Sequence, residues 1–247
     1  MRDDESFGGR VTRLSALADP VRRALYRFVA AQAEPVSREQ AADGVEVPVH
    51  TARHHLDRLV EAGLLATEFR RLTGRTGPGA GRPAKLYRRA ESEVAVSVPP
   101  RSYDLAGQVL ARAVERSLAG TPLERAVDEA AAEAGERVAA EAARQPARLA
   151  PLRRLARVLA PHGYEPRVEA TASSAPPSLV LGNCPFDRLA ADHTELVCGL
   201  NRSFVGAVAE GIGCDGLRAE LDPAPGRCCV RVLDVGDPGG DSGVHAP

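Results

Sequence analysis

Residues 49–65 read VHTARHHLDRLVEAGLL, and this run sets the expected architecture of the first part of the chain. Apolar residues recur in it at spacings of three and four, as on a helix that buries one face. They are Ala52, Leu56, Leu59 and Val60. The polar residues project from the opposite face, and Gly63 follows, where glycine commonly ends a helix. The run therefore predicts an amphipathic helix with an exposed polar face.

Two more helices are expected upstream of this run. Residues 15–32, SALADPVRRALYRFVAAQ, carry apolar side chains at helical spacing and are expected to form one scaffold helix. Ser37 and Gln40 then have the spacing of a capping box, in which each side chain satisfies a backbone N–H at the helix start. A short helix is expected there, ending near Asp43 and Gly44.

The segment that follows Gly63 is expected to form a hairpin. Residues 64–90 read as a strand, a tip rich in glycine and proline from Gly74 to Pro83, and a second strand. Three helices followed by a basic hairpin form a winged helix-turn-helix, whose third helix enters the major groove of DNA.

The charge of this region favours a phosphate-binding face. Residues 49–90 hold nine basic against three acidic side chains, although the whole chain has a net charge of -1. A solvated basic surface is the alternative interpretation of the charge alone. Arg53 is the best candidate for a guanine contact, and Thr51 for a thymine methyl group or a phosphate. The expected DNA contacts, from the third helix and the hairpin tip, are His50, Thr51, Arg53, His54, Arg75 and Arg82.

The rest of the chain is expected to form helices and then a sheet. We assign residues 1–98 to the winged-helix domain, 99–145 to a helical linker or dimerisation segment, 146–235 to an α+β domain with an antiparallel sheet, and 236–247 to a disordered tail. The Ala-rich helices at 103–118 and 122–143 either contact a second copy or pack within one chain. We favour the dimer, because operator half-sites require a twofold protein.

Five cysteines lie in the last third of the chain, which indicates a thiol site. They are Cys184, Cys198, Cys214, Cys228 and Cys229. An odd number does not suit a disulfide framework, whereas thiolates are soft ligands for iron–sulfur clusters or zinc. His193 can supply a nitrogen ligand, and Cys214 is either a fourth ligand or a bystander. Buried cysteines acting as small apolar residues are the alternative.

The two parts together resemble a known family. ADPVRRALYRFV, TARHHLDRLVEAGLL and GRPAKLYR look like the ArsR-type winged-helix regulators, and NCPFDRLAADHTELVC with GRCCVRV resembles the SufR-like iron–sulfur repressors among them. That resemblance implies that Cys184, Cys198 and one of Cys228 or Cys229 hold a cluster. On a regular strand Cys228 shares a face with the apolar Val230, so we favour Cys228. The Cys-Cys pair itself departs from the SufR-like pattern.

These features predict a DNA-binding transcriptional regulator, expected to be a repressor, that binds a palindromic operator in double-stranded DNA as a homodimer. Its affinity would depend on an iron–sulfur cluster or a metal. The alternatives are a regulator that senses a small molecule or thiol redox state, with structural or zinc-binding cysteines, and a cysteine-dependent redox enzyme tethered to DNA. No CxxC, nucleophile elbow or HExxH motif is present, so we do not expect an enzyme. Without an apolar run long enough for a membrane, and without a signal region, the chain is expected in the cytoplasm.

Overall fold

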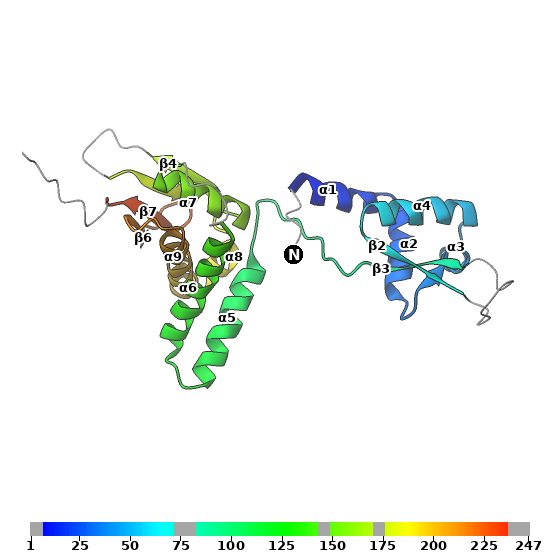
Figure 1. Ribbon diagram of the computed structural model, residues 1–247, viewed down its shortest axis with the longest axis horizontal. Helices are drawn as coiled ribbons and strands as arrows, with labels where there is room; N and C mark the ends of the chain where they lie inside the picture. Colours follow the sequence, from blue (N-terminus) through cyan, green and yellow to red (C-terminus); the bar gives the residue numbers. More distant parts are fainter. Residues whose placement is uncertain (1–6, 72–82, 143–148, 170–175, 237–247) are drawn as a thin grey trace, which may run out of the picture. The chain divides into compact units, whose positions relative to one another are not determined.

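The computed structural model describes residues 7–71, 83–142, 149–169 and 176–236, and it divides the chain into two compact units (Figure 1). The first unit is Met1–Val96 and the second is Ser97–Pro247. The division falls two residues before the boundary after residue 98 that the sequence predicts. The helices expected to form a separate linker share a unit with the sheet that follows them.

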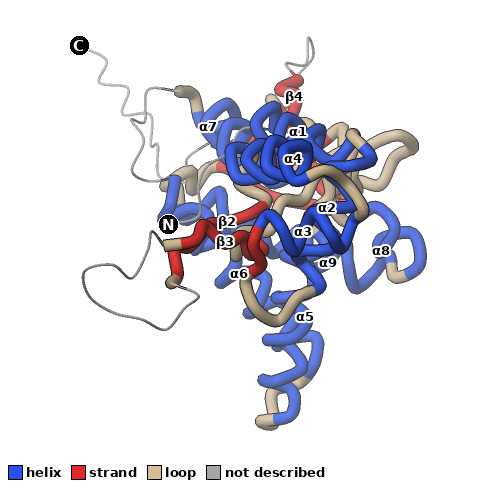
Figure 2. The backbone as a smooth tube through the Cα atoms, turned by 90° about the vertical axis from the view of Figure 1, so that its right-hand side faces the viewer, coloured by secondary structure: helices blue, strands red, loops and turns tan. Residues whose placement is uncertain are grey.

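The first unit combines helices with a small antiparallel sheet. In chain order its elements are α1 (Phe7–Ser15), the 3₁₀ helix η1 (Ala16–Ala18), α2 (Pro20–Ala31), β1 (Val36–Ser37), α3 (Arg38–Val45), α4 (Val49–Glu61), β2 (Leu65–Arg70) and β3 (Ala84–Arg89). The sheet has the order β1-β3-β2. Figure 2 shows β2 and β3 side by side. β2 and β3 pair from Leu65 opposite Arg89 to Arg70 opposite Ala84, which makes the hairpin of a winged helix-turn-helix.

The expected scaffold helix is not continuous, and this prediction was wrong. The chain breaks between η1 and α2, where Asp19 has an extended backbone and Pro20 occupies the first turn of α2. Proline disfavours the helical conformation in the residue before it and lacks the N–H that a continuing helix needs. Asp19 then caps α2 by accepting a hydrogen bond from the backbone N–H of Arg22 at 2.8 Å.

The helix-turn-helix follows the local signals of the sequence. Ser37 and Gln40 form both hydrogen bonds of the capping box at the start of α3. After α4 the chain turns at Gly63, whose φ of 65° lies in the left-handed region that favours glycine. Leu56 and Leu59 of α4 are fully buried against Leu25 of α2, so one face of α4 is fixed and the other faces outward.

The second unit packs its helices on a four-stranded antiparallel sheet. Its elements are α5 (Tyr103–Leu118), α6 (Leu123–Ala142), α7 (Pro151–Leu159), the 3₁₀ helix η2 (Ala160–His162), β4 (Pro166–Glu169), β5 (Ser178–Leu181), α8 (Asp187–Asp192), α9 (Thr194–Gly211), β6 (Leu217–Leu221) and β7 (Val230–Asp234). The strand order is β4-β5-β7-β6. The expected α+β fold with antiparallel sheets is therefore confirmed.

Helices α6 and α9 lie side by side in the centre of this unit. A Cβ atom added to Gly135 of α6 would lie 2.5 Å from the backbone oxygen of Phe204 in α9. The absence of a side chain at Gly135 is what allows the two backbones to approach so closely. The buried alanines of α6 line the same face, so this Ala-rich helix is part of the unit's own core.

Candidate functional site

The outward face of α4 carries the side chains predicted to read DNA. His50, Arg53 and His54 are exposed and Thr51 is half-buried. Arg53 keeps 64% of its side-chain surface exposed, so its guanidinium group can reach another molecule. The predicted contacts Arg75 and Arg82 lie outside the described residues.

Asp57 ties this face of α4 to the hairpin. One oxygen of its carboxylate accepts hydrogen bonds from Lys85 Nζ at 2.6 Å and from the hydroxyl of Tyr87 at 3.0 Å, both on β3. The other oxygen lies 3.9 Å from Arg53 Nε. Burial raises the pKa of Asp57, but the hydrogen bonds from Lys85 and Tyr87 outweigh it, and the net pKa is lowered. The carboxylate thus stays ionised and holds α4 in a fixed orientation to β3.

The basic excess of this region is partly neutralised by ion pairs. Arg70 pairs with Glu34 and Glu68, Arg58 with Glu61, and Arg88 with Glu91. All of these pairs are at the surface, where such contacts contribute little to stability and can be exchanged for contacts to phosphate. The counted charge alone therefore overstates the free positive charge of this face.

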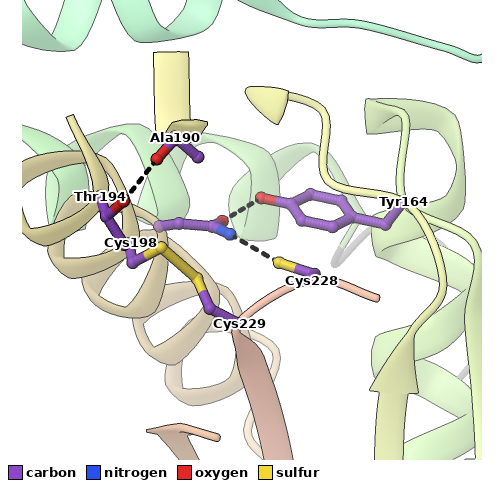
Figure 3. Close-up of a disulfide and its surroundings, with 7 residues drawn as sticks. Tyr164, Ala190, Thr194, Cys198, Cys228 and Cys229 are labelled. Carbon is purple, nitrogen blue, oxygen red and sulfur yellow. Dashed lines mark hydrogen bonds between the residues drawn. A yellow bond between two sulfur atoms is a disulfide. The ribbon is translucent and has the colours of Figure 1, made fainter. Parts of the chain in front are cut away.

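Four of the five cysteines meet in the second unit, although they come from three separate segments. Cys184 lies before α8, Cys198 lies in the second turn of α9, and Cys228 and Cys229 directly precede β7. Cys198 and Cys229 are joined by a disulfide bond (Figure 3). The sequence predicted that only one residue of the Cys-Cys pair would face the site, on the assumption of a regular strand. β7 begins only at Val230, and each cysteine of the pair has a different cysteine partner.

The second pair is Cys184 and Cys228, whose thiols lie close enough for each to shift the pKa of the other. The interaction with Cys184 and, to a smaller extent, the hydrogen bond that Asn201 donates to Cys228 Sγ lower the pKa of Cys228. The pKa of Cys184 is raised by its interaction with Cys228 and by burial. The interaction therefore favours loss of the proton from Cys228 over loss from Cys184.

A buried polar chain supports Cys228. Asn201 of α9 donates a hydrogen bond from Nδ2 to Cys228 Sγ at 3.1 Å and accepts one at Oδ1 from the hydroxyl of Tyr164 (Figure 3). Asn201 is 1% exposed and Tyr164 3%, so neither group can exchange its partner for water. Sequence reasoning missed both residues. The only signal was an asparagine three residues after Cys198, on the same face of a helix.

Two predicted ligands lie apart from this cysteine site. Cys214 is buried beyond the end of α9, where its sulfur accepts a hydrogen bond from Arg154 Nη2 at 2.9 Å. His193 is exposed at the residue before α9. Over the ranges that the structure describes, no group of three histidine, cysteine or acidic side chains is arranged to hold a metal ion.

The chemistry of the cysteine site depends on whether the disulfide bond between Cys198 and Cys229 is formed or reduced. In the bridged form, Cys198 and Cys229 have no thiolate to offer a metal. Reduction of the bridge adds two thiols to those of Cys184 and Cys228 in the same unit. Thiolates are ligands of soft metals and of iron–sulfur clusters, but the described residues place no three such ligands around one point. The thiols of the site can also form and break the bridge itself.

Residues 17–68 match a family described as a helix-turn-helix domain, and the match takes in α2, α3 and α4 with most of β2. No curated protein and no solved structure matches the chain. None of the helices described is both long and apolar enough to cross a membrane. The helix-turn-helix domain supports a DNA-binding transcriptional regulator and favours a regulator over an enzyme.

Proposed function

We propose that this protein is a transcriptional repressor that binds a palindromic operator as a homodimer and whose affinity for DNA is controlled at the cysteine site. The observation that carries the proposal is the outward face of α4 within a matched helix-turn-helix domain. The exposed side chains on this face have the chemistry of base readout, and Asp57 fixes the helix that bears them.

The test of DNA reading compares two arginines on the full chain. Duplexes that bind are first selected from a random library, and affinity is then measured by fluorescence anisotropy for Arg53→Ala and Arg82→Ala. We expect Arg53→Ala to lose about tenfold on the selected duplex and to relax its sequence preference. Arg82→Ala should weaken binding to all duplexes alike. If both variants lose the same affinity for selected and for scrambled duplexes, Arg53 does not contact bases.

Exposed apolar residues at one end of the α5–α6 pair support the dimer. Leu118 is 84% exposed, Leu123 54% and Val114 51%. Such a group on the surface of a protein that reads twofold DNA is suited to contact a second copy. We expect Leu118→Glu to lower the dimer fraction in analytical ultracentrifugation. If this variant sediments like the wild type, Leu118 is not part of the dimer contact.

An iron–sulfur cluster is the first candidate ligand, because thiolates are its usual ligands. The cysteines would have to come together after the bridge is reduced, since the described residues hold no group of three potential metal ligands. Cys184, Cys198 and Cys228 would hold the cluster, with Cys229 as the alternative to Cys228. The cluster would supply a group that responds to oxidants and to iron supply. Zinc is the alternative metal, and neither His193 nor Cys214 lies among the four cysteines that meet.

A thiol switch is the second candidate, and the Cys198–Cys229 bond favours it. Hydrogen peroxide can take two electrons and two protons from the two thiols, which forms the bridge and releases two molecules of water. Reduction by a dithiol reverses the reaction. In this case no metal is needed for DNA affinity to change.

The deciding measurement is iron, zinc and sulfide content with a visible spectrum, on protein purified without oxygen. Cys184→Ser is compared with Cys214→Ser, a matched control because Cys214 lies apart from the site. Iron and sulfide that are lost only in Cys184→Ser support the cluster. One zinc per chain supports a zinc site, and a metal-free protein whose DNA affinity follows the Cys198–Cys229 bond supports the thiol switch. Metal-free protein with unchanged affinity would contradict control at this site.

A further inference from the structure

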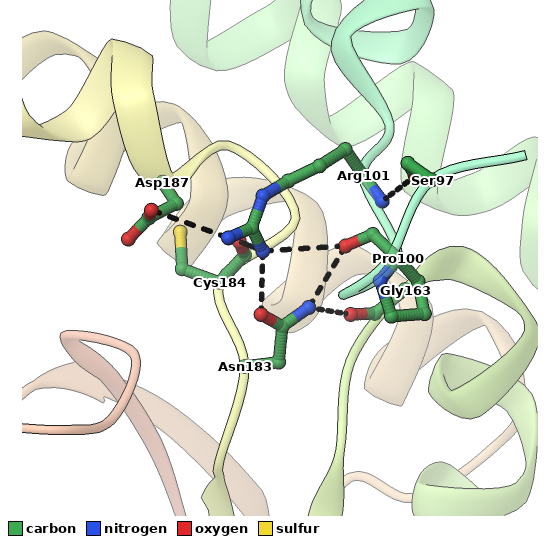
Figure 4. Close-up of polar contacts among 7 residues, drawn as sticks. All are labelled: Ser97, Pro100, Arg101, Gly163, Asn183, Cys184 and Asp187. Carbon is green, nitrogen blue, oxygen red and sulfur yellow. Dashed lines mark hydrogen bonds and ion pairs between the residues drawn. The ribbon is translucent and has the colours of Figure 1, made fainter.

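Residues 97–102, here named the joining segment, are the first residues of the second unit. Along the chain they lie between the helix-turn-helix unit and α5. Their hydrogen bonds run to the loop that carries Cys184, which is more than eighty positions away in sequence (Figure 4). The joining segment and the cysteine site are therefore in direct contact.

Arg101 makes three of these contacts. Its Nη1 donates to the side-chain oxygen of Asn183 and, at 3.0 Å, to the backbone oxygen of Cys184. Its Nη2 lies 3.2 Å from the carboxylate of Asp187. Only 18% of the Arg101 side chain is exposed, so the guanidinium group is held in one geometry. The rigid, planar fork of arginine suits several acceptors at once in a way that lysine does not.

The other contacts join the same two segments to each other and to Gly163, which follows η2. Asn183 Nδ2 donates to the backbone oxygens of Pro100, at 2.9 Å, and of Gly163. The backbone N–H of Ser102 donates to the oxygen of Pro185 at 3.1 Å. Asn183 is 8% exposed, so losing these partners would leave a buried amide unsatisfied. The joining segment is therefore held by hydrogen bonds to both backbone and side-chain atoms of the loop that carries Cys184.

Cys184 contacts the joining segment through its backbone and Cys228 through its side chain. Its backbone oxygen accepts a hydrogen bond from Arg101 at 3.0 Å, while its thiol lies beside that of Cys228. A change at the thiol, by ligation or by loss of the Cys228 contact, that shifts the backbone of Cys184 also moves its carbonyl group. Because hydrogen bonds weaken steeply with misalignment, a small movement of this carbonyl weakens the hydrogen bond that Arg101 donates to it.

We propose that Arg101 is a positioning residue that transmits the state of Cys184 to the joining segment, and so to the chain that leads to the helix-turn-helix unit. This inference rests on the proposed control of DNA affinity at the cysteine site. It is independent of whether a cluster, zinc or a disulfide sets the state of Cys184.

The first test measures amide hydrogen exchange in the full-length protein. The N–H groups of Arg101 and Ser102 are bonded to Ser97 Oγ and Pro185 O, so they report on the joining segment. We expect Cys184→Ala to raise their exchange rates about tenfold, as a local opening does. Exchange in α4 should not change. The control is Arg157→Ala, which removes an exposed arginine of α7.

The second test is a double-mutant cycle on DNA affinity with the selected duplex. We expect Cys184→Ala to change affinity about tenfold in the wild-type background, and less than about twofold when Arg101→Ala is present. Arg101→Lys, which keeps the charge but not the fork, should restore only part of the effect. Circular dichroism checks that each variant is folded, and the exchange test needs no change at Arg101.

The outcomes separate the two proposals. If Cys184→Ala changes affinity equally with and without Arg101, the transmission through Arg101 is overturned and the control by cysteine stands. If Cys184→Ala changes affinity in neither background, the proposed control fails. In that case the exchange rates decide: faster exchange at Arg101 and Ser102 upholds the mechanical link, and unchanged rates overturn it.

Discussion

The first unit carries its candidate functional side chains outside its core, whereas the second carries them within or beside it. Arg53 is 64% exposed and projects from a helix whose other face is buried. Cys228 is 1% exposed and packs among core residues. An exposed side chain that contacts DNA can be substituted with little loss of folding stability, because surface substitutions rarely change the free energy of unfolding by much. Changes at the cysteine site alter packing and function together, so its variants need controls for stability.

The largest expected effect tests how rigid the interior of the second unit is. Gly135→Val places a branched side chain against the backbone of α9, where a Cβ atom alone would meet Phe204 O at 2.5 Å. We expect the free energy of unfolding of this unit to fall by about 3 kcal/mol, measured by hydrogen exchange in α9. Exchange in α4 should stay the same.

Gly199→Ala is the matched control for that substitution. Gly199 also lies in a helix, but an added Cβ atom meets nothing within 4 Å. Alanine should therefore raise stability by up to about 1 kcal/mol. Equal losses from both substitutions would mean that close packing at Gly135 is not the cause.

A tyrosine from each unit gives the next comparison. Tyr164→Phe leaves Oδ1 of the buried Asn201 without its partner, and we expect a loss of about 2 kcal/mol in urea denaturation. Tyr87→Phe removes a hydrogen bond to Asp57, whose side chain is 35% exposed and keeps Lys85. Its loss should be less than about 1 kcal/mol, since water replaces the hydroxyl group. A larger loss for Tyr87→Phe would reverse the contrast between the units.

A smaller effect is expected from pH. The pKa of Asp57 is lower in the folded protein than in the unfolded chain, so its contribution to stability is present above the unfolded value and lost as the pH falls through the folded value. Wild type should therefore lose more stability than Asp57→Asn between about pH 5 and pH 2. Parallel pH curves for the two proteins would show that Asp57 does not stabilise the contact between α4 and β3.

The smallest effect on stability is expected from a substitution on the outward face of α4. Arg53→Ala should change the free energy of unfolding by less than about 0.5 kcal/mol, although it weakens binding to the selected duplex. Thermal unfolding of the full chain measures this. A large destabilisation would mean that the pair with Asp57 makes Arg53 a structural residue rather than a reader.

The sequence predicted the first unit well because its signals are local. The capping box at Ser37 and Gln40 and the turn at Gly63 depend on residues within one helical turn of each other. The scaffold helix was the exception, since its apolar period continues across Pro20 while the backbone does not. Periodicity reports which face is buried, and proline decides where the helix begins.

The sequence by itself determined that the chain begins with a helix-turn-helix domain and that its cysteines gather in its last third. Only the tertiary structure decided that Cys198 joins Cys229, that Cys184 meets Cys228, and that Cys214 lies apart. The physical reason is sequence separation. Helical spacing and caps are set by neighbouring residues, whereas the meeting of α9, β7 and the loop before α8 depends on how the whole core packs.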